Sequence, residues 1–248
     1  MDPGPHGAGA AGLLGSGGGR PLLDDARADP VTLPRPGETT VLAVRDLTLR
    51  VGTRTLVHGL DVTARPGDVV AVTGPNGTGK STLLRTLAGL RRSEPGAVAY
   101  GPAVTAAAGG HRNGIGYAAA GLAAPGAFTT VEFLRLLARL RGVRETAPEA
   151  FGLGACAATP IAALSTGERK KVGVAAAVLH RPALVILDEP FEALDEESMD
   201  VVTRQVEGVR RRGGAVVLCT HRAERTTDVA TAFVRLGDPR SSPESTAT

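Results

Sequence analysis

Val69-Val70-Ala71-Val72-Thr73 is followed directly by Gly74-Pro75-Asn76-Gly77-Thr78-Gly79-Lys80-Ser81 in this chain of 248 residues. The run Val69–Val72 is continuously apolar, which is typical of a strand buried on both faces of a sheet. Leucines at positions 83, 84, 87 and 90 recur with helical spacing, which predicts a helix over Ser81–Leu90. The sequence therefore predicts a strand, a glycine-rich loop and a helix in immediate succession.

The loop Gly74–Ser81, called the phosphate loop below, has the residues that a phosphate group requires. Glycines let the backbone turn tightly, so that successive N–H groups point at phosphate oxygens, and the helix start adds its positive end. Lys80 is expected to reach the β- and γ-phosphates, and Ser81 to place its hydroxyl on Mg²⁺. The predicted nucleotide-binding residues here are Gly74, Pro75, Asn76, Gly77, Thr78, Gly79, Lys80, Ser81 and Thr82.

Further strands and helices are predicted on both sides of this unit. Strands are expected at Val41–Leu49, Leu56–Ala64, Leu184–Leu187 and Ala215–Cys219, and helices at Val131–Arg141 and Glu168–Leu179. Buried strands that alternate with helices predict an α/β fold with a mainly parallel sheet.

Two carboxylates end the predicted strand Leu184–Leu187. Ligands bind at the carboxyl ends of parallel strands, so Asp188 is a candidate metal ligand. Glu189 is the candidate general base that orients or deprotonates the attacking water. A solvated strand end is the alternative interpretation, and the phosphate loop on the same chain argues against it.

Leu164-Ser165-Thr166-Gly167-Glu168, called the signature segment below, precedes the predicted helix Glu168–Leu179. Ser165 and Glu168 have the spacing of a capping box, which is a sufficient structural explanation for an isolated motif. The functional alternative is a second helix N-terminus that binds a γ-phosphate from the opposite side.

Five segments together carry a family resemblance. They are the phosphate loop, the signature segment, Asp188-Glu189-Pro190, Ala193-Leu194-Asp195 and Thr220-His221. In this order they resemble the ATP-binding cassette (ABC) ATPases, from about Val41 to Leu236. The resemblance implies a P-loop NTPase core with a mainly parallel sheet, an antiparallel β subdomain and a small helical subdomain at about 121–170.

The resemblance also implies site residues and partners. Ser165, Gly167 and Glu168 match the signature motif, Asp195 the D-loop and His221 the switch histidine, so Lys80, Glu189 and His221 become the catalytic candidates. ATP and Mg²⁺ are the implied ligands, held between two cassettes paired head to tail. Transport would then need a separate integral membrane permease, with the cassette on the cytoplasmic face of the cell membrane.

Two departures from the family pattern concern activity. Residues 41–58 contain no aromatic residue to stack on adenine, and Val51 is at about the matching position. The family's Mg²⁺-binding Gln matches Ala120, and Gln205 is the chain's single Gln. We expect slower hydrolysis or altered coupling. A binding-only regulatory cassette and a soluble non-transport ABC ATPase therefore stay open as alternatives.

Composition sets the remaining limits. A net charge of +3, from 28 basic and 25 acidic residues, does not predict a nucleic-acid surface. Cys156 and Cys219 have no metal-ligand spacing, which favours a reducing compartment. Neither a secretory signal nor a transmembrane helix is predicted. Residues 1–38 and 238–248 are expected to be disordered tails that flank one ATP-binding domain at 39–237.

Overall fold

The computed structural model describes residues 40–94, 97–107, 113–220, 226–227 and 229–237. The predicted tails at 1–38 and 238–248 lie outside the described residues, and so does His221.

Two separate sheets form the centre of the described structure. The smaller is antiparallel, has the order β2-β1-β4, and consists of β1 (Leu42–Val51), β2 (Arg54–Ala64) and β4 (Val98–Tyr100). The larger has the order β5-β6-β7-β3-β8. Its strands are β3 (Val69–Thr73), β5 (Ile115–Ala118), β6 (Leu184–Asp188), β7 (Ala215–Cys219) and β8 (Ala232–Arg235).

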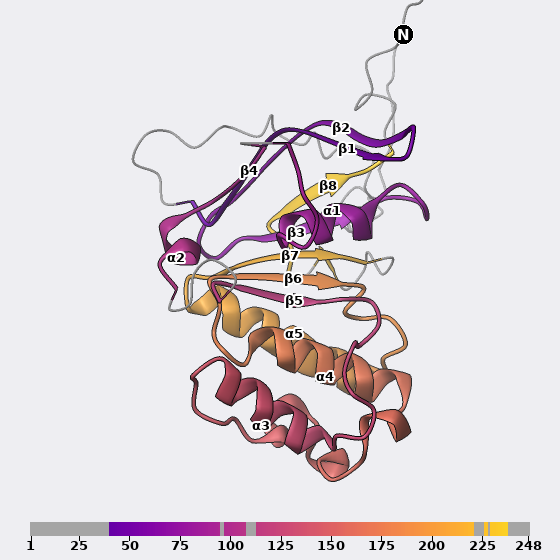
Figure 1. Cartoon of the computed structure of the whole chain (residues 1–248), viewed down its shortest axis with the longest axis vertical. Helices are drawn as coiled ribbons and strands as arrows, with labels where there is room; N and C mark the ends of the chain where they lie inside the picture. The colour runs from indigo at the N-terminus through magenta and orange to yellow at the C-terminus, as the bar shows by residue number, and fades with distance from the viewer. Residues whose placement is uncertain (1–39, 95–96, 108–112, 221–225, 228, 238–248) are drawn as a thin grey trace, which may run out of the picture.

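Every neighbouring pair in the larger sheet is parallel. In Figure 1 the arrows of β5, β6 and β7 point to the same side, so their carboxyl ends share one edge. The predicted parallel α/β sheet is therefore confirmed. Strands β4, β5 and β8 were not predicted, because runs of three or four residues carry little periodic signal.

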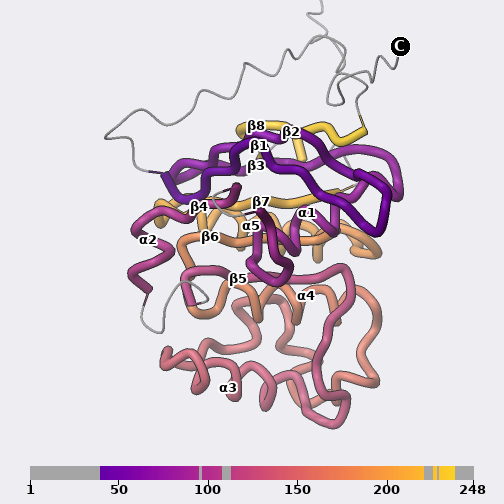
Figure 2. Tube along the Cα trace, turned by 45° about the horizontal axis from the view of Figure 1, so that its top comes forward, coloured from indigo at the N-terminus to yellow at the C-terminus, as the bar shows by residue number. Residues whose placement is uncertain are grey.

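The helices lie on both faces of the parallel sheet. They are α1 (Lys80–Leu87), α2 (Pro102–Thr105), α3 (Thr130–Leu140), α4 (Thr166–Val178) and α5 (Glu196–Arg211), with 3₁₀ turns at Pro148–Phe151, Gly154–Cys156 and Ile161–Ala163. Helices α4 and α5 cover one face, while α1 and the antiparallel sheet lie toward the other (Figure 1). Figure 2 shows α3 beyond α4, on the side away from the antiparallel sheet.

Alternate residues of the central strands enter two different cores. Val69 and Ala71 of β3 pack in the core that includes α4 and α5. Val70 and Val72 pack in the core that includes α1 and the antiparallel sheet. Because both faces of the strand are covered, each position must be apolar, which explains the uninterrupted run in the sequence. Each buried valine or leucine contributes about 1.5–3 kcal/mol to the hydrophobic free energy of folding.

Helix α1 ends three residues before its predicted end. Gly89 has a left-handed φ of 70°, and the Leu90 amide bonds back to the Arg85 carbonyl at 2.9 Å. This glycine-terminated turn closes the helix after Leu87 and leaves Leu90 65% exposed. The helical spacing of Leu90 in the sequence was therefore a misleading signal.

Candidate functional site

The phosphate loop leaves the carboxyl end of β3 and enters α1 through Gly79. Gly74, Gly77 and Gly79 have φ values of 141°, 78° and 101°, a region that favours glycine. A Cβ on Gly74 would lie 2.5 Å from the Leu236 carbonyl oxygen, so this position also requires glycine for space. The loop conformation thus depends on its glycines, as the spacing predicted.

Lys80 is buried inside the curve of this loop. Its Nζ donates hydrogen bonds to the carbonyl oxygens of Gly74 and Pro75, at 2.8 and 3.0 Å. Thr78 closes the loop by donating to the same Pro75 oxygen at 2.9 Å. Asn76 is exposed, and Ser81 and Thr82 are half-buried in the first turn of α1. The loop therefore presents a fixed ammonium group and a helix N-terminus, a combination suited to binding phosphate.

Asp188 ends β6, and Glu189 follows it into a strained turn. Glu189 has a left-handed φ of 51°, which is uncommon for a residue with a side chain, and its N–H donates to the Cys219 carbonyl at 3.0 Å. Both carboxylates are buried, Asp188 to 2% exposure. Such strained, buried acids are typical of functional sites.

Cys219, at the end of β7, lies in register with Asp188. Its Sγ donates to Asp188 Oδ1 at 2.8 Å. Burial raises the pKa of the Cys219 thiol, and the hydrogen bond to Asp188 raises it further. The thiol therefore acts as a neutral donor to the carboxylate. Among the described residues, Asp188 Oδ2 has no hydrogen-bond partner.

The donor set of this edge fits a hard divalent cation. β6 is separated from β3 only by β7, and α1 packs against both β6 and β7. This arrangement brings the first turn of α1, with the Ser81 hydroxyl, toward the strand ends that carry Asp188. Mg²⁺ prefers a few protein oxygens together with substrate phosphates and water. The buried Asp188 Oδ2, which lacks a protein donor, is the atom such an ion would satisfy.

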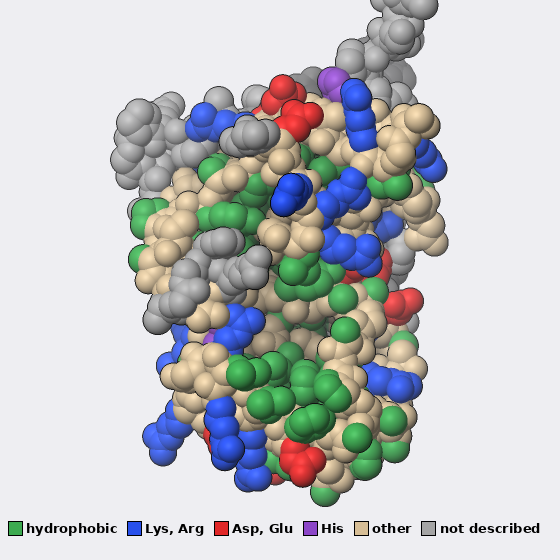
Figure 3. Space-filling view, in the orientation of Figure 1, with side chains coloured by type: hydrophobic (Ala, Val, Ile, Leu, Met, Phe, Trp, Pro, Cys, Tyr) green, Lys and Arg blue, Asp and Glu red, His purple; other side chains and the backbone are tan. Residues whose placement is uncertain are grey.

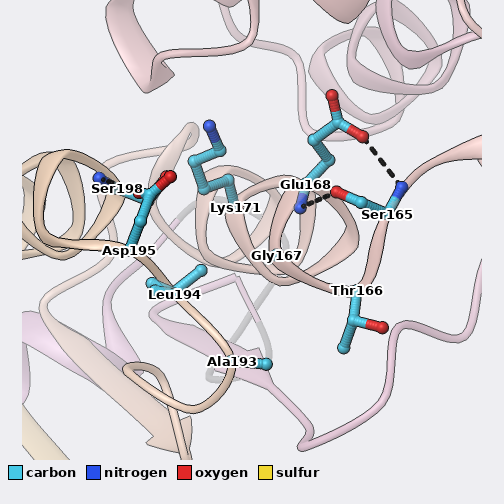
Figure 4. A pocket seen from close by; sticks show the side chains of 9 residues that line it. All are labelled: Ser165, Thr166, Gly167, Glu168, Lys171, Ala193, Leu194, Asp195 and Ser198. Atoms are coloured by element: carbon cyan, nitrogen blue, oxygen red, sulfur yellow. Dashed lines mark hydrogen bonds between the residues drawn. The ribbon is translucent and has the colours of Figure 1, made fainter.

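The signature segment forms the N-terminus of α4 as a complete capping box. Glu168 N–H donates to Ser165 Oγ at 3.2 Å, and Ser165 N–H donates to a Glu168 carboxylate oxygen at 2.8 Å. Figure 4 shows both bonds. The hydrogen bond from the Ser165 backbone N–H, followed by one from the Ser165 side chain, lowers the pKa of the Glu168 carboxyl. Asp195 is the N-cap residue of α5 and accepts from Ser198 N–H at 2.8 Å. The side-chain hydrogen bond with Ser198 lowers the pKa of Asp195.

These two helix N-termini border one open hollow of about 410 Å³, called the signature hollow below. Figure 4 shows Lys171 between Asp195 and Glu168. The lining residues are Ser165, Thr166, Gly167, Glu168, Lys171, Ala193, Leu194, Asp195 and Ser198. None belongs to the phosphate loop, because α1 and α4 start on opposite faces of the sheet. The structure thus brings Ser165, Gly167, Glu168 and Asp195 together, apart from the phosphate loop.

The two positions at which the sequence departs from the family pattern, Val51 and Ala120, are both exposed. Val51 is 50% exposed at the end of β1. Ala120 follows β5, and its carbonyl accepts from Lys170 Nζ at 2.8 Å.

Sequence reasoning missed Lys170, Lys171, Ser198 and Cys219 as site neighbours. Cys219 ends a predicted strand, but the sequence does not show that this strand lies beside the one that ends at Asp188, and no sequence pattern marks the other three residues.

A comparison with protein families identifies the family to which a chain with this site belongs. The family model described as "ABC transporter" matches residues 57–192. The chain belongs to the ABC transporter family. It is an ATP-binding subunit of that family, whose ATP-binding proteins are ATPases. The family and the ATP-binding function predicted from the motifs are therefore confirmed.

Individual relatives agree with this assignment. The cassette is 36% identical over 183 residues to the "Cytochrome c biogenesis ATP-binding export protein CcmA" of Paracoccus denitrificans (strain Pd 1222), covering 73% of this chain and 82% of the relative. It is 38% identical over 191 residues to the protein of the same name from Salmonella typhi, covering 73% and 89%. A solved "ATP binding subunit of ABC transporter" superposes with a TM-score of 0.70 at 26% identity, covering 79% of this chain and 86% of that one.

In the part of the cassette that the structure describes, no helix combines the length and apolarity needed to cross a membrane.

Proposed function

We propose that the cassette hydrolyses ATP with Mg²⁺ in a head-to-tail dimer and thereby drives export through a separate membrane-spanning subunit. The observation that carries this proposal is the separation of the phosphate loop from the signature hollow within one chain. Each holds a helix N-terminus suited to phosphate, and a single nucleotide would contact both only if a second cassette supplied one of them.

Each residue then has a distinct task. The loop from Gly74 to Thr82 holds the phosphates, with Lys80 exchanging its carbonyl partners for the β- and γ-oxygens. Glu189 orients the attacking water and accepts its proton. Ser165, Gly167, Glu168 and Asp195 approach the terminal phosphate from the second chain. His221, which lies outside the described residues, is proposed as the γ-phosphate contact.

Ser81 and Asp188 are the residues that would hold Mg²⁺. The ion would neutralise negative charge on the phosphate oxygens when bound. Asp188 is buried, and its Oδ2 has no protein donor within the part of the chain that the structure describes, so this oxygen is available to the ion.

Association with a membrane subunit is supported by the surface as well as by the relatives. Helix α3 exposes Leu136 and Leu140, and Figure 3 shows hydrophobic side chains gathered at the level of α3 and α4. Apolar surface of this kind marks interaction sites. Both relatives above are named as export proteins, which supports export over import. We accordingly place the cassette on the cytoplasmic face of the membrane, without a nucleic-acid partner.

The missing Gln and the missing aromatic residue favour a slower enzyme. Ala120 offers no side-chain oxygen to the metal, and Val51 offers less stacking surface than an aromatic ring. Losing one ligand from a shell that keeps Ser81, Asp188, phosphates and water weakens metal binding without abolishing it. A regulatory cassette that binds ATP without hydrolysis is the second candidate, favoured by the same two positions.

Phosphate release from the purified full chain in Mg-ATP tests the proposal. We expect release that disappears in Glu189→Gln, while nucleotide binding by that variant persists. Binding without any release by the unmodified chain would support the regulatory cassette instead. Co-purification of an integral membrane protein separates a transporter subunit from a non-transport ATPase.

A further inference from the structure

We propose that Cys219 is a positioning residue for the metal-binding carboxylate of Asp188. Its thiol holds Oδ1 from the neighbouring strand and thereby leaves Oδ2 directed to the metal. This inference rests on the proposed function, because it takes Asp188 as the Mg²⁺ ligand.

Backbone register brings the two side chains together. Asp188 and Cys219 are partners at the carboxyl ends of the parallel strands β6 and β7. The Glu189 N–H donates to the Cys219 carbonyl at 3.0 Å, so the backbones remain paired one residue beyond Asp188. The thiol therefore approaches the carboxylate from a fixed backbone position.

Burial makes the contact specific. Cys219 is 0% exposed and Asp188 is 2% exposed, so bulk water does not replace the thiol at Oδ1. The Sγ–Oδ1 distance is 2.8 Å, within hydrogen-bonding range. A buried carboxylate that lost this donor would have both oxygens to satisfy instead of one.

The two oxygens of Asp188 consequently differ. Oδ1 accepts from the thiol, whereas Oδ2 is buried and has no hydrogen-bond partner among the described residues. Leaving such an atom unpaired is costly unless a ligand satisfies it. The thiol fixes the orientation of the carboxylate, so metal binding requires little reorganisation, in the way that outer-shell hydrogen bonds orient metal ligands.

The test measures how strongly the metal and the nucleotide support each other's binding. The dissociation constant of a fluorescent ATP analogue is measured with the full chain in Mg²⁺ and in EDTA. The ratio of the constant in EDTA to the constant in Mg²⁺ is then compared between variants. Cys219→Val removes the donor and keeps an apolar side chain, Cys219→Ser restores a donor, and Cys219→Ala replaces Val if the larger side chain prevents folding. Cys156→Val is the matched control, since this buried thiol donates to the Leu153 carbonyl in another part of the core.

We expect Cys219→Val to reduce the ratio about fivefold to tenfold, because the lost hydrogen bond comes from a thiol, which is a weak donor. The affinity in EDTA should stay unchanged, which a general packing defect would not allow. Cys219→Ser should recover most of the ratio, and Cys156→Val should leave it unaltered. An unchanged ratio in both Cys219→Val and Cys219→Ala would overturn the inference.

Asp188→Asn separates this inference from the proposed function. If that variant loses the Mg²⁺ effect while Cys219→Val keeps it, only the positioning role fails. If Asp188→Asn retains the full Mg²⁺ effect, Asp188 is not the metal ligand and both proposals fail at this residue.

Discussion

The ammonium group of Lys170 on α4 donates a hydrogen bond to the backbone carbonyl of Ala120 over 2.8 Å. Lys170 is buried, and its weaker partner, Glu192, lies 3.7 Å away and is largely exposed. The bond connects the helix that begins with the signature segment to the residues that follow β5. It joins two places that the sequence separates by fifty residues.

We expect Lys170→Met to loosen the segment after β5 without unfolding the domain. The lost hydrogen bond to a charged group and the relieved burial of an ammonium oppose each other, so the global free energy of unfolding should change by less than about 1 kcal/mol. Amide exchange at residues 119–122 should accelerate about fivefold to twentyfold. Hydrogen-exchange mass spectrometry checks this, with Lys171→Met as the control, because Lys171 donates to Gly152 instead. Unaltered exchange at these residues would contradict the proposed connection.

Ala120→Gln should increase the rate of phosphate release. Ala120 lies two residues beyond the end of β5, and β5 pairs with β6, which ends at Asp188. A Gln there would offer an amide oxygen at the edge where the metal is proposed to bind, and we expect an increase of about threefold to tenfold. Ala123→Gln, at an exposed position farther along the same segment, is the control. Equal rates in the two variants would show that Ala120 does not limit the enzyme.

The sequence predicted those parts of the molecule that local rules determine. The buried run Val69–Val72, the glycines of the phosphate loop and the capping box of Ser165 each follow from spacing alone, and each has the expected local geometry. Helix α5 was not among the predicted helices, although its buried Met199, Val202 and Val206 recur with helical spacing. Asp195 is in fact its N-cap.

Contacts across the fold could not be predicted in this way. Cys219 meets Asp188 only because β6 and β7 are neighbours in a particular register, and one sequence does not specify strand order. Lys170 reaches Ala120 because α4 packs on β5. These side chains carry no motif, so their positions became known only with the tertiary structure.

Two inactive variants should restore activity when mixed. Lys80→Ala removes the ammonium of the phosphate loop, and Ser165→Arg fills the signature hollow with a bulky side chain. If each nucleotide contacts one chain's loop and the other chain's signature segment, a mixed dimer holds one intact site. We expect each variant alone to release little phosphate and the mixture to recover part of the original rate. Lys80→Ala mixed with Glu189→Gln is the control, because both changes disable the same side of the shared site and no mixed dimer then holds an intact one. No recovery with Lys80→Ala and Ser165→Arg, or equal recovery in the control, would argue against shared sites.

His180 should make the stability of the fold depend on pH between 4 and 6.5. Burial, followed by the nearby charge of Arg141, lowers the pKa of His180 from 6.5 to about 4. Above pH 6.5 the imidazole is neutral in both states. As the pH falls below 6.5 the imidazole becomes protonated in the unfolded chain, whereas in the folded chain it stays neutral down to about pH 4. The free energy of unfolding therefore decreases across this window. Because the imidazole is only partly buried, solvent screening reduces the loss to about 1–2 kcal/mol.

Urea unfolding of the full chain from pH 4 to 7.5 measures this dependence, and His180→Leu supplies the comparison. The difference between the two curves isolates the imidazole from the carboxylates, which titrate in both proteins. It should be flat above pH 6.5 and steepest between 4 and 6.5. NMR titration of the His180 ring gives an independent value, and a midpoint near 6.5 in the folded protein would contradict the burial argument.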